Sequence, residues 1–202
     1  MTTKLVLALF TAYWLGSIPF AYIAVRILKG IDIRKHGSGN VGATNVFRLA
    51  GPLPGSLVAI LDLLKGFAAV WLCDLLVPGS TIVARLAAGM MAIVGHNWPL
   101  WLGFKGGRGV LTTAGVFLYL SWIPALGALA VFGIVFWISR YVSLGSLSAV
   151  TVFPLLMVLT PSGRGCPVMV GMAVTAAIFV YIRHIPNIRR LVSGTEYRFG
   201  EK

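Results

Sequence analysis

Long apolar runs separated by short polar segments dominate the chain. An α-helix needs about 20 apolar residues to cross a bilayer, and most of these runs approach that length. The pattern predicts an all-α, polytopic integral membrane protein whose residues 1–202 form a single membrane-embedded domain. The predicted spans lie near residues 5–25, 57–77, 81–97, 110–138, 144–159 and 167–182.

The apolar stretch 110–138 is too long for one span and short for two ordinary ones. The sequence Ser121-Trp122-Ile123-Pro124 lies at its middle, and proline interrupts or kinks a helix. We therefore expect two short spans that meet there, with one long kinked helix as the alternative. The total is about seven helices, an odd number that places the two termini on opposite sides of the membrane.

Charge indicates the orientation and the class of partner. Only 11% of the residues are charged, 58% are hydrophobic, and the mean hydropathy is +0.90, whereas soluble domains carry about 25% charged residues. The net charge is +12, and most basic residues fall in the segments of one membrane side. The positive-inside rule makes that side cytoplasmic and places the N-terminus outside and the C-terminus in the cytoplasm. Because the basic residues lie between apolar runs, we expect anionic lipids or an anionic substrate as partners rather than nucleic acid.

Two glycine-rich, basic segments, residues 37–48 and 103–109, join these spans on the predicted cytoplasmic side, where a third polar segment begins at Arg183. Glycines allow backbone amides to approach an anion, and Lys and Arg neutralise it. The convergence of three such segments on one face predicts phosphate chemistry at the membrane surface. The alternatives are a plain flexible turn for the first segment and a positively charged membrane anchor for the second.

Several polar side chains outside the glycine pattern have more than one interpretation. His96 is expected to support the second segment, and His184 either handles a proton or caps a helix end. Asp62 and Lys65 lie three positions apart within a span, where charges are costly. They either pair with each other or bring Lys65 to the phosphate site. Asp74 and Arg85 are expected to pair across an outer turn.

Other catalytic signatures are absent or accidental. Residues 37–42 match the spacing G-x-G-x-x-G, but the preceding element is a membrane helix rather than a strand, so no dinucleotide site is expected. The sequence has no Walker A, G-x-S-x-G or H-E-x-x-H motif, and neither glycine-rich segment contains an acidic residue that could hold Mg²⁺. We therefore expect no metal and no cofactor, and a substrate that is already activated, such as an acyl phosphate.

These residues resemble the bacterial acyl-phosphate:glycerol-3-phosphate acyltransferases over nearly the whole chain. The matching motifs are Ser17-Ile18-Pro19-Phe20, residues 37–46, Asp62-Leu63-Leu64-Lys65-Gly66, Gly95-His96-Asn97-Trp98-Pro99, residues 104–110, Arg183-His184, Asn187-Ile188 and Gly194-Thr195-Glu196. The resemblance implies a seven-helix enzyme of the bacterial inner membrane with its active site at the cytoplasmic face. It implies transfer of a fatty acyl group from acyl phosphate to glycerol-3-phosphate, which gives lysophosphatidic acid and phosphate for phospholipid biosynthesis.

Residue types and resemblance together predict the site. The catalytic set is Ser38, Arg48, Lys105, His184 and Asn187, and the substrate-binding set is Gly37, Gly39, Asn40, Gly42, Thr44, Asn45, Gly106, Gly107 and Arg108. The first segment and Lys105 are expected to hold the acyl phosphate and its oxyanion, while His184 and Asn187 position the acceptor hydroxyl. The base is either His184 or the phosphate of the substrate, and the resemblance implies the latter. Membrane lipids are expected around the protein, and no obligate protein partner is inferred.

Two positions depart from the family pattern. Arg108 stands where the family often has Lys, and Ile185-Pro186 stands where polar residues are common. The alternative function is a membrane transporter of phosphorylated metabolites, which would also need polar residues along a path to the outer face. Such residues are scarce in the sequence, and no inverted repeat is visible.

Overall fold

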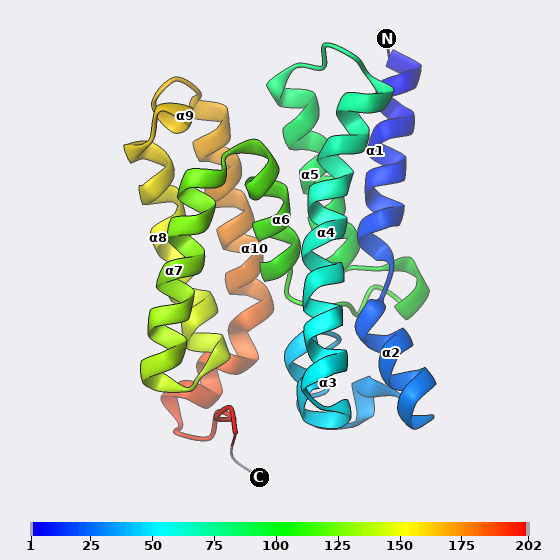
Figure 1. Ribbon diagram of the computed structural model, residues 1–202, viewed down its shortest axis with the longest axis vertical. Helices are drawn as coiled ribbons and strands as arrows, with labels where there is room; N and C mark the ends of the chain where they lie inside the picture. Colours follow the sequence, from blue (N-terminus) through cyan, green and yellow to red (C-terminus); the bar gives the residue numbers. More distant parts are fainter. Residues whose placement is uncertain (1, 201–202) are drawn as a thin grey trace. The chain divides into compact units, whose positions relative to one another are not determined.

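The computed structural model describes residues 2–200, and within that range every regular element is a helix (Figure 1). The all-α fold predicted from the apolar runs is therefore confirmed. The elements are α1 (Thr2–Ser17), α2 (Phe20–Lys29), the 3₁₀ turn η1 (Ile33–Lys35), α3 (Ala43–Ala50), α4 (Pro52–Leu76), α5 (Ile82–Asn97), the 3₁₀ turn η2 (Leu100–Leu102), α6 (Val110–Leu120), α7 (Trp122–Ser139), α8 (Val142–Leu159), α9 (Pro161–Arg164) and α10 (Pro167–Val192).

Within residues 2–200, five helical segments are long and apolar enough to cross a membrane: Thr2–Lys29, which contains α1 and α2, and the helices α4, α7, α8 and α10. The two others that were expected to span, α5 and α6, have 16 and 11 residues. At 1.5 Å per residue they are about 24 Å and about 17 Å long, against about 30 Å of hydrocarbon. The count of seven spans and the side of each terminus stay predictions.

The chain divides into two compact units between Leu120 and Ser121. This division lies at the break predicted within residues 110–138, and the two helices expected there are α6 and α7. The kinked single helix is therefore the wrong alternative for this stretch. That residues 1–202 act as one domain stays a prediction.

Two spans differ from their predicted extent. The first apolar run is interrupted at Ile18-Pro19, where α1 ends and α2 begins, because proline has no N–H to continue the helical ladder. The last span does not end near residue 182 but continues as α10 to Val192, with Pro186 inside the helix. The segment expected to be a polar tail from Arg183 onward is therefore mostly helical.

Helices α1 and α5 of the first unit touch backbone to backbone at two glycines. A Cβ atom on Gly16 of α1 would collide with the carbonyl oxygen of Ala92, and a Cβ atom on Gly95 of α5 would collide with the carbonyl oxygen of Tyr13. Each helix thus supplies the glycine that admits the backbone of the other. Such close approach is how helices gain packing energy in a bilayer, where apolar side chains are equally well solvated by lipid.

Helices α4 and α6 form a second contact of the same kind. A side chain on Gly66 would collide with the Thr112 carbonyl, and one on Gly115 would collide with the Leu63 carbonyl. A hydrogen bond of 3.1 Å from the Thr112 hydroxyl to the Asp62 carbonyl joins the same two helices. The short helix α6 is therefore held tightly along α4.

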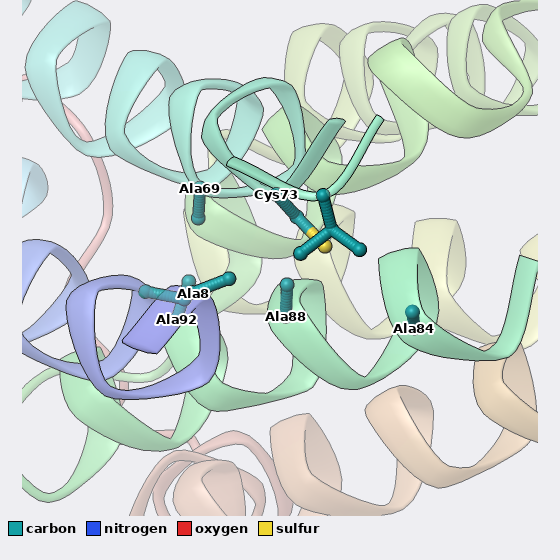
Figure 2. Close-up of a cluster of buried hydrophobic side chains, with 8 residues drawn as sticks. Ala8, Ala69, Cys73, Ala84, Ala88 and Ala92 are labelled. Carbon is teal, nitrogen blue, oxygen red and sulfur yellow. The ribbon is translucent and has the colours of Figure 1, made fainter. Parts of the chain in front are cut away.

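Small side chains fill the space between α1, α4 and α5 (Figure 2). Ala84, Ala88 and Ala92 lie four residues apart on one face of α5, and they face Ala8 of α1 and Ala69 of α4, with Cys73 beside them. Positions four residues apart share one side of a helix. A seam of alanines lets three helices pack closely, and the large apolar side chains are left to face the lipid.

A polar network closes the end of the first unit where α4 turns into α5. The Asp74 carboxylate accepts hydrogen bonds from the Ser80 hydroxyl at 2.5 Å, Arg85 Nε at 2.7 Å and the Tyr119 hydroxyl at 2.7 Å. The predicted pairing of Asp74 with Arg85 is confirmed. The network joins α4, α5 and α6 far along the chain from both glycine-rich segments.

In the second unit α8 packs against both α7 and α10. Large apolar side chains on α7 remain exposed, including Trp137 and Ile138, which are 79% and 77% accessible. Exposed apolar surface of this kind is expected where a helix faces lipid rather than water. The segment after α10 returns to the unit, because the Phe199 amide donates to the Arg140 carbonyl at 2.9 Å.

The glycine contacts generate a stability prediction. Gly115→Ala should lower the free energy of unfolding by about 1–3 kcal/mol, because the new methyl group collides with the Leu63 carbonyl and overpacks the α4–α6 contact. Gly133→Ala is the matched control, since the same methyl group on exposed α7 meets nothing within 4 Å. It should be neutral or slightly stabilising. Equal shifts of the thermal midpoint in detergent for the two variants would contradict the packing argument.

Candidate phosphate site and its supports

Asn45 organises the first glycine-rich segment from within. Its side chain on α3 is fully buried, and its Oδ1 accepts a hydrogen bond of 3.0 Å from the Ser38 amide. Its Nδ2 lies 3.3, 3.0 and 3.2 Å from the carbonyl oxygens of Ile33, His36 and Asn40. These contacts give Asn45 a supporting role within the loop, and the prediction that it also contacts substrate stays a prediction.

Glycine is needed in this loop for two backbone conformations. Gly37 and Gly39 have φ angles of 60° and 69°, in the left-handed region that other residues avoid. A side chain on Gly37 would also strike the Asn45 amide. Ser38 lies between them and is half-buried, as is Asn40. The tight turn therefore presents Ser38 at a fixed place.

The loop ends at the N-terminus of α3. Gly42 is the N-cap residue, and no side chain in the described part of the chain caps this helix end. The first N–H groups of a helix have no partner within it, and together with the helix dipole they favour an anion. Thr44 lies in the first turn and is half-buried, while Arg48 lies one turn further on and is exposed. Four predicted residues, Ser38, Gly42, Thr44 and Arg48, thus lie within one loop and one short helix.

An ion pair at η1 precedes the loop. Asp32 caps η1 by accepting a hydrogen bond from the Arg34 amide, and its carboxylate binds the Arg34 guanidinium at 2.7 Å. The side-chain hydrogen bond from Arg34 lowers the pKa of Asp32 to about 2. The hydrogen bonds from Arg34 thus favour the ionised form of this carboxylate.

The second glycine-rich segment binds the end of α5 through its backbone. The Gly106 amide donates to the Asn97 carbonyl and the Gly107 amide donates to the His96 carbonyl, both at 3.1 Å. Any side chain on Gly107 would collide with the His96 ring. These glycines are therefore needed for close packing, and the prediction that they also bind substrate stays a prediction. His96 supports the segment, as the sequence indicated.

The cations of the second segment remain on its surface. Lys105 is exposed and Arg108 is half-buried. Phe104, immediately before Lys105, has a φ of 62°, which is unusual for a bulky residue and marks a backbone held by its surroundings. The segment thus offers two basic side chains on a backbone that is fixed at Gly106 and Gly107.

A buried ion pair lies beneath this segment. Lys65 Nζ lies 2.6 Å from Asp62 Oδ1, and the two side chains are 1% and 4% accessible. His96 Nδ1 lies 3.5 Å from the same carboxylate oxygen. Mutual pairing is therefore the correct alternative for Asp62 and Lys65. The sequence indicated this pairing, since opposite charges three positions apart in a span are costly unless they pair. It did not indicate that Asp62 also lies close to His96.

The pair lines a small recess in the first unit. Its walls come from the break in the first span, from α4, from the end of α5 and from both glycine-rich segments. They include Ser17, Pro19, Val41, Asp62, Lys65, His96, Gly106 and Gly107. The two loops thus meet around one recess within the first unit.

His184 and Asn187 belong to the second unit, where they lie three residues apart on one buried face of α10. His184 Nδ1 lies 2.8 Å from the Val180 carbonyl; because a carbonyl only accepts, Nδ1 carries a proton and donates it. Asn187 Nδ2 donates to Glu196 at 2.7 Å. Asn187 Oδ1 is buried and has no hydrogen-bond partner among residues 2–200.

Glu196 was noted in the sequence only as part of a motif. In the structure it accepts hydrogen bonds from the Ser143 hydroxyl at 3.0 Å, from Asn187 and from Arg190 at 2.7 Å. It therefore fixes the Asn187 side chain and ties the segment after α10 to α8. Among residues 2–200, no three His, Cys, Asp or Glu side chains lie close enough to hold a metal ion together.

The role of Asn45 can be tested by hydrogen exchange. Asn45→Ala should speed exchange of the Ser38 amide at least tenfold, because that amide loses its acceptor and three carbonyls lose a donor. Thr44→Ala, one position along the same helix, is the control and should leave this exchange rate unchanged. Deuterium uptake of residues 36–42 in detergent measures both, and a wild-type rate in Asn45→Ala would refute the supporting role.

Comparison with known proteins explains why these residues occur together. The family model described as glycerol-3-phosphate acyltransferase matches residues 6–194. Glycerol-3-phosphate acyltransferase 2 of Moorella thermoacetica is 48% identical and glycerol-3-phosphate acyltransferase of Desulforamulus reducens is 44% identical. These alignments cover 97% and 98% of this chain and 98% and 96% of the relatives. A crystal structure of PlsY (YgiH), an integral membrane glycerol 3-phosphate acyltransferase, superposes with a TM-score of 0.88 at 37% identity, over 97% of this chain and 96% of that one. The chain thus belongs to the glycerol-3-phosphate acyltransferase family and is an integral membrane protein.

Proposed function

We propose that this enzyme transfers a fatty acyl group from acyl phosphate to glycerol-3-phosphate, giving lysophosphatidic acid and inorganic phosphate at the cytoplasmic face of the bacterial inner membrane. The observation that carries the proposal is the similarity, over 97% of the chain, to PlsY crystal structures in a glycerol 3-phosphate form and a lysophosphatidic acid form. These two molecules are the acceptor and the product of the reaction.

The phosphoryl group of the donor is assigned to the first unit. Ser38, Thr44 and the uncapped N-terminus of α3 offer neutral donors, and Arg48, Lys105 and Arg108 offer positive charge. Gly37, Gly39, Asn40 and Gly42 shape the backbone around Ser38. Since the Gly106 and Gly107 amides bind α5, the second segment contributes through its cationic side chains. Lys105 and Arg48 stabilise the negative charge that develops on the carbonyl oxygen and on the leaving phosphate.

The acceptor hydroxyl is assigned to His184 and Asn187. The proton on His184 Nδ1 is directed to the Val180 carbonyl, so in the neutral ring Nε2 carries the lone pair. Asn187 Oδ1 can accept a hydrogen bond from a hydroxyl, while Glu196 holds its amide nitrogen. Both side chains are fixed by contacts within the second unit, which suits them to orient a substrate group.

The reaction needs no covalent enzyme intermediate. The glycerol-3-phosphate hydroxyl oxygen attacks the acyl carbon, and its proton passes to a base. The tetrahedral oxyanion then collapses, the bond between the acyl carbon and the phosphate oxygen breaks, and phosphate leaves with the bonding electrons. The base is His184 Nε2 or a phosphate oxygen of the substrate, and the family resemblance favours the substrate phosphate.

The donor is tested directly with purified protein in detergent or lipid. With radiolabelled glycerol-3-phosphate, labelled lysophosphatidate should form with palmitoyl phosphate and without added metal, and should not form with palmitoyl-CoA. Product from palmitoyl-CoA alone would make a thioester the donor. A folded preparation that gives no product from either donor would overturn the assignment.

The phosphate cradle is tested by two substitutions. Ser38→Ala and Lys105→Ala should each lower kcat about 100-fold or more, because each removes a donor to charge that develops in the transition state. Lys35→Ala removes an exposed lysine just before the first loop and should stay within about twofold of wild type, as expected for a surface change. Wild-type rates in both Ser38→Ala and Lys105→Ala would remove the argument for the cradle.

A further inference from the structure

The buried Lys65 holds together elements that precede the catalytic loops. Its ammonium group donates to the Ile18 carbonyl at 3.0 Å and binds Asp62 at 2.6 Å, and it lies 5.5 Å from the centre of the Phe20 ring. Ile18 precedes Pro19, whose missing N–H ends the helical ladder of α1. Lys65 therefore supplies a donor at the break and fixes the place where α2 departs towards the first loop.

Asp62 extends the same network to the second loop. Its Oδ1 atom lies between Lys65 and His96, whose Nδ1 is 3.5 Å away. The His96 ring in turn packs directly against Gly107, and the His96 carbonyl accepts the Gly107 amide at 3.1 Å. The same Cβ atom on Gly107 that would strike the His96 ring would also approach the Val41 carbonyl of the first loop to 2.8 Å, so Gly107 lies against both. A continuous chain of contacts thus runs from the helix break to both loops.

We propose that Asp62, Lys65 and His96 act as positioning residues that hold the Gly106–Gly107 backbone, and with it Lys105 and Arg108, against the first loop. This proposal rests on the proposed function for the role of those two cations, but the positioning itself is a statement about the loop alone. None of the three residues is assigned a contact with substrate. Their effect is transmitted through the backbone bonds of Gly106 and Gly107.

The opposite charges of Asp62 and Lys65 explain why the two residues occur together in this network. A lone carboxylate under a phosphate site would repel the substrate, and a lone buried ammonium group would be costly to keep within the membrane. Paired at 2.6 Å, the two charges largely cancel. Asp62 can then orient His96, and Lys65 can donate to Ile18, while the pair adds no net charge to the recess. Lys65 is consequently a structural cation rather than one more phosphate ligand.

The test replaces the pair by neutral groups of similar size. The double variant Asp62→Asn, Lys65→Met leaves no unpaired charge, and such replacements of buried pairs are often tolerated by the fold. Asp74→Asn is the matched control, because Asp74 lies in the same helix and also holds three donors, Ser80, Arg85 and Tyr119, but contacts neither loop. Deuterium uptake by residues 103–110, kcat and KM are measured for each folded protein.

The double variant should speed exchange of the Gly106 and Gly107 amides at least tenfold and lower kcat/KM for palmitoyl phosphate at least tenfold. Asp74→Asn should leave both within about twofold of wild type even where it lowers the thermal midpoint, because distant sites act independently. Wild-type exchange in the double variant, or equally fast exchange in Asp74→Asn, would overturn the positioning role.

A second variant decides the matter if the double variant does not fold. His96→Gln keeps the ion pair and removes only the ring that packs on Gly107, and it should speed exchange of the Gly107 amide; an unchanged rate would overturn the proposal. The exchange measurement does not depend on the reaction. A folded wild-type protein without acyltransferase activity would contradict the proposed function. The exchange rates alone decide whether Asp62, Lys65 and His96 hold the Gly106–Gly107 backbone in place.

Discussion

Direct contact between helix backbones is the constraint on which the first unit depends. In lipid, burying an apolar side chain against another helix gains little over leaving it in acyl chains, so association relies on close packing. Reciprocal glycines meet this constraint twice, Gly16 with Gly95 between α1 and α5, and Gly66 with Gly115 between α4 and α6. With α5 and α6 held in this way against α1 and α4, the loop that joins them has both ends fixed.

Many polar groups in this protein form ion pairs or hydrogen bonds with other groups of the same chain. Each of the four acidic residues among residues 2–200 forms an ion pair: Asp32, Asp62, Asp74 and Glu196. The Asn45 amide and the Gly106 and Gly107 amides are likewise engaged by neighbouring backbone. An unsatisfied polar group is costly in an apolar setting, so these bonds give the loops one shape. The side chains proposed to bind substrate are those that extend from the loops in this fixed conformation.

The sequence was most informative where a feature is local. Apolar length predicted the helical membrane fold, and Ser121 marked the break between α6 and α7. The packing roles of Gly106, Gly107 and Asn45 were not predicted, because loop glycines and amides suit both anion binding and tight packing. Which one holds depends on residues far away in the chain, such as His96 and Ile33. The continuation of α10 past Pro186 was also missed, because a helix held by tertiary packing can tolerate a proline that local propensity would exclude.

The short lengths of α5 and α6 have a consequence for how a lipid-soluble substrate would reach the loop between them. Helices of about 24 Å and about 17 Å cannot match a hydrocarbon layer of about 30 Å. If α5 and α6 span the bilayer as predicted, the bilayer beside them must thin, or the loop that joins them must lie below the level of the head groups. Either adjustment would bring Lys105 and Arg108 closer to the depth at which the long-chain donor of the proposed reaction rests. Hydrophobic mismatch would then shorten the path from membrane to active site, so that the acyl chain could remain dissolved in lipid while its polar end reacts.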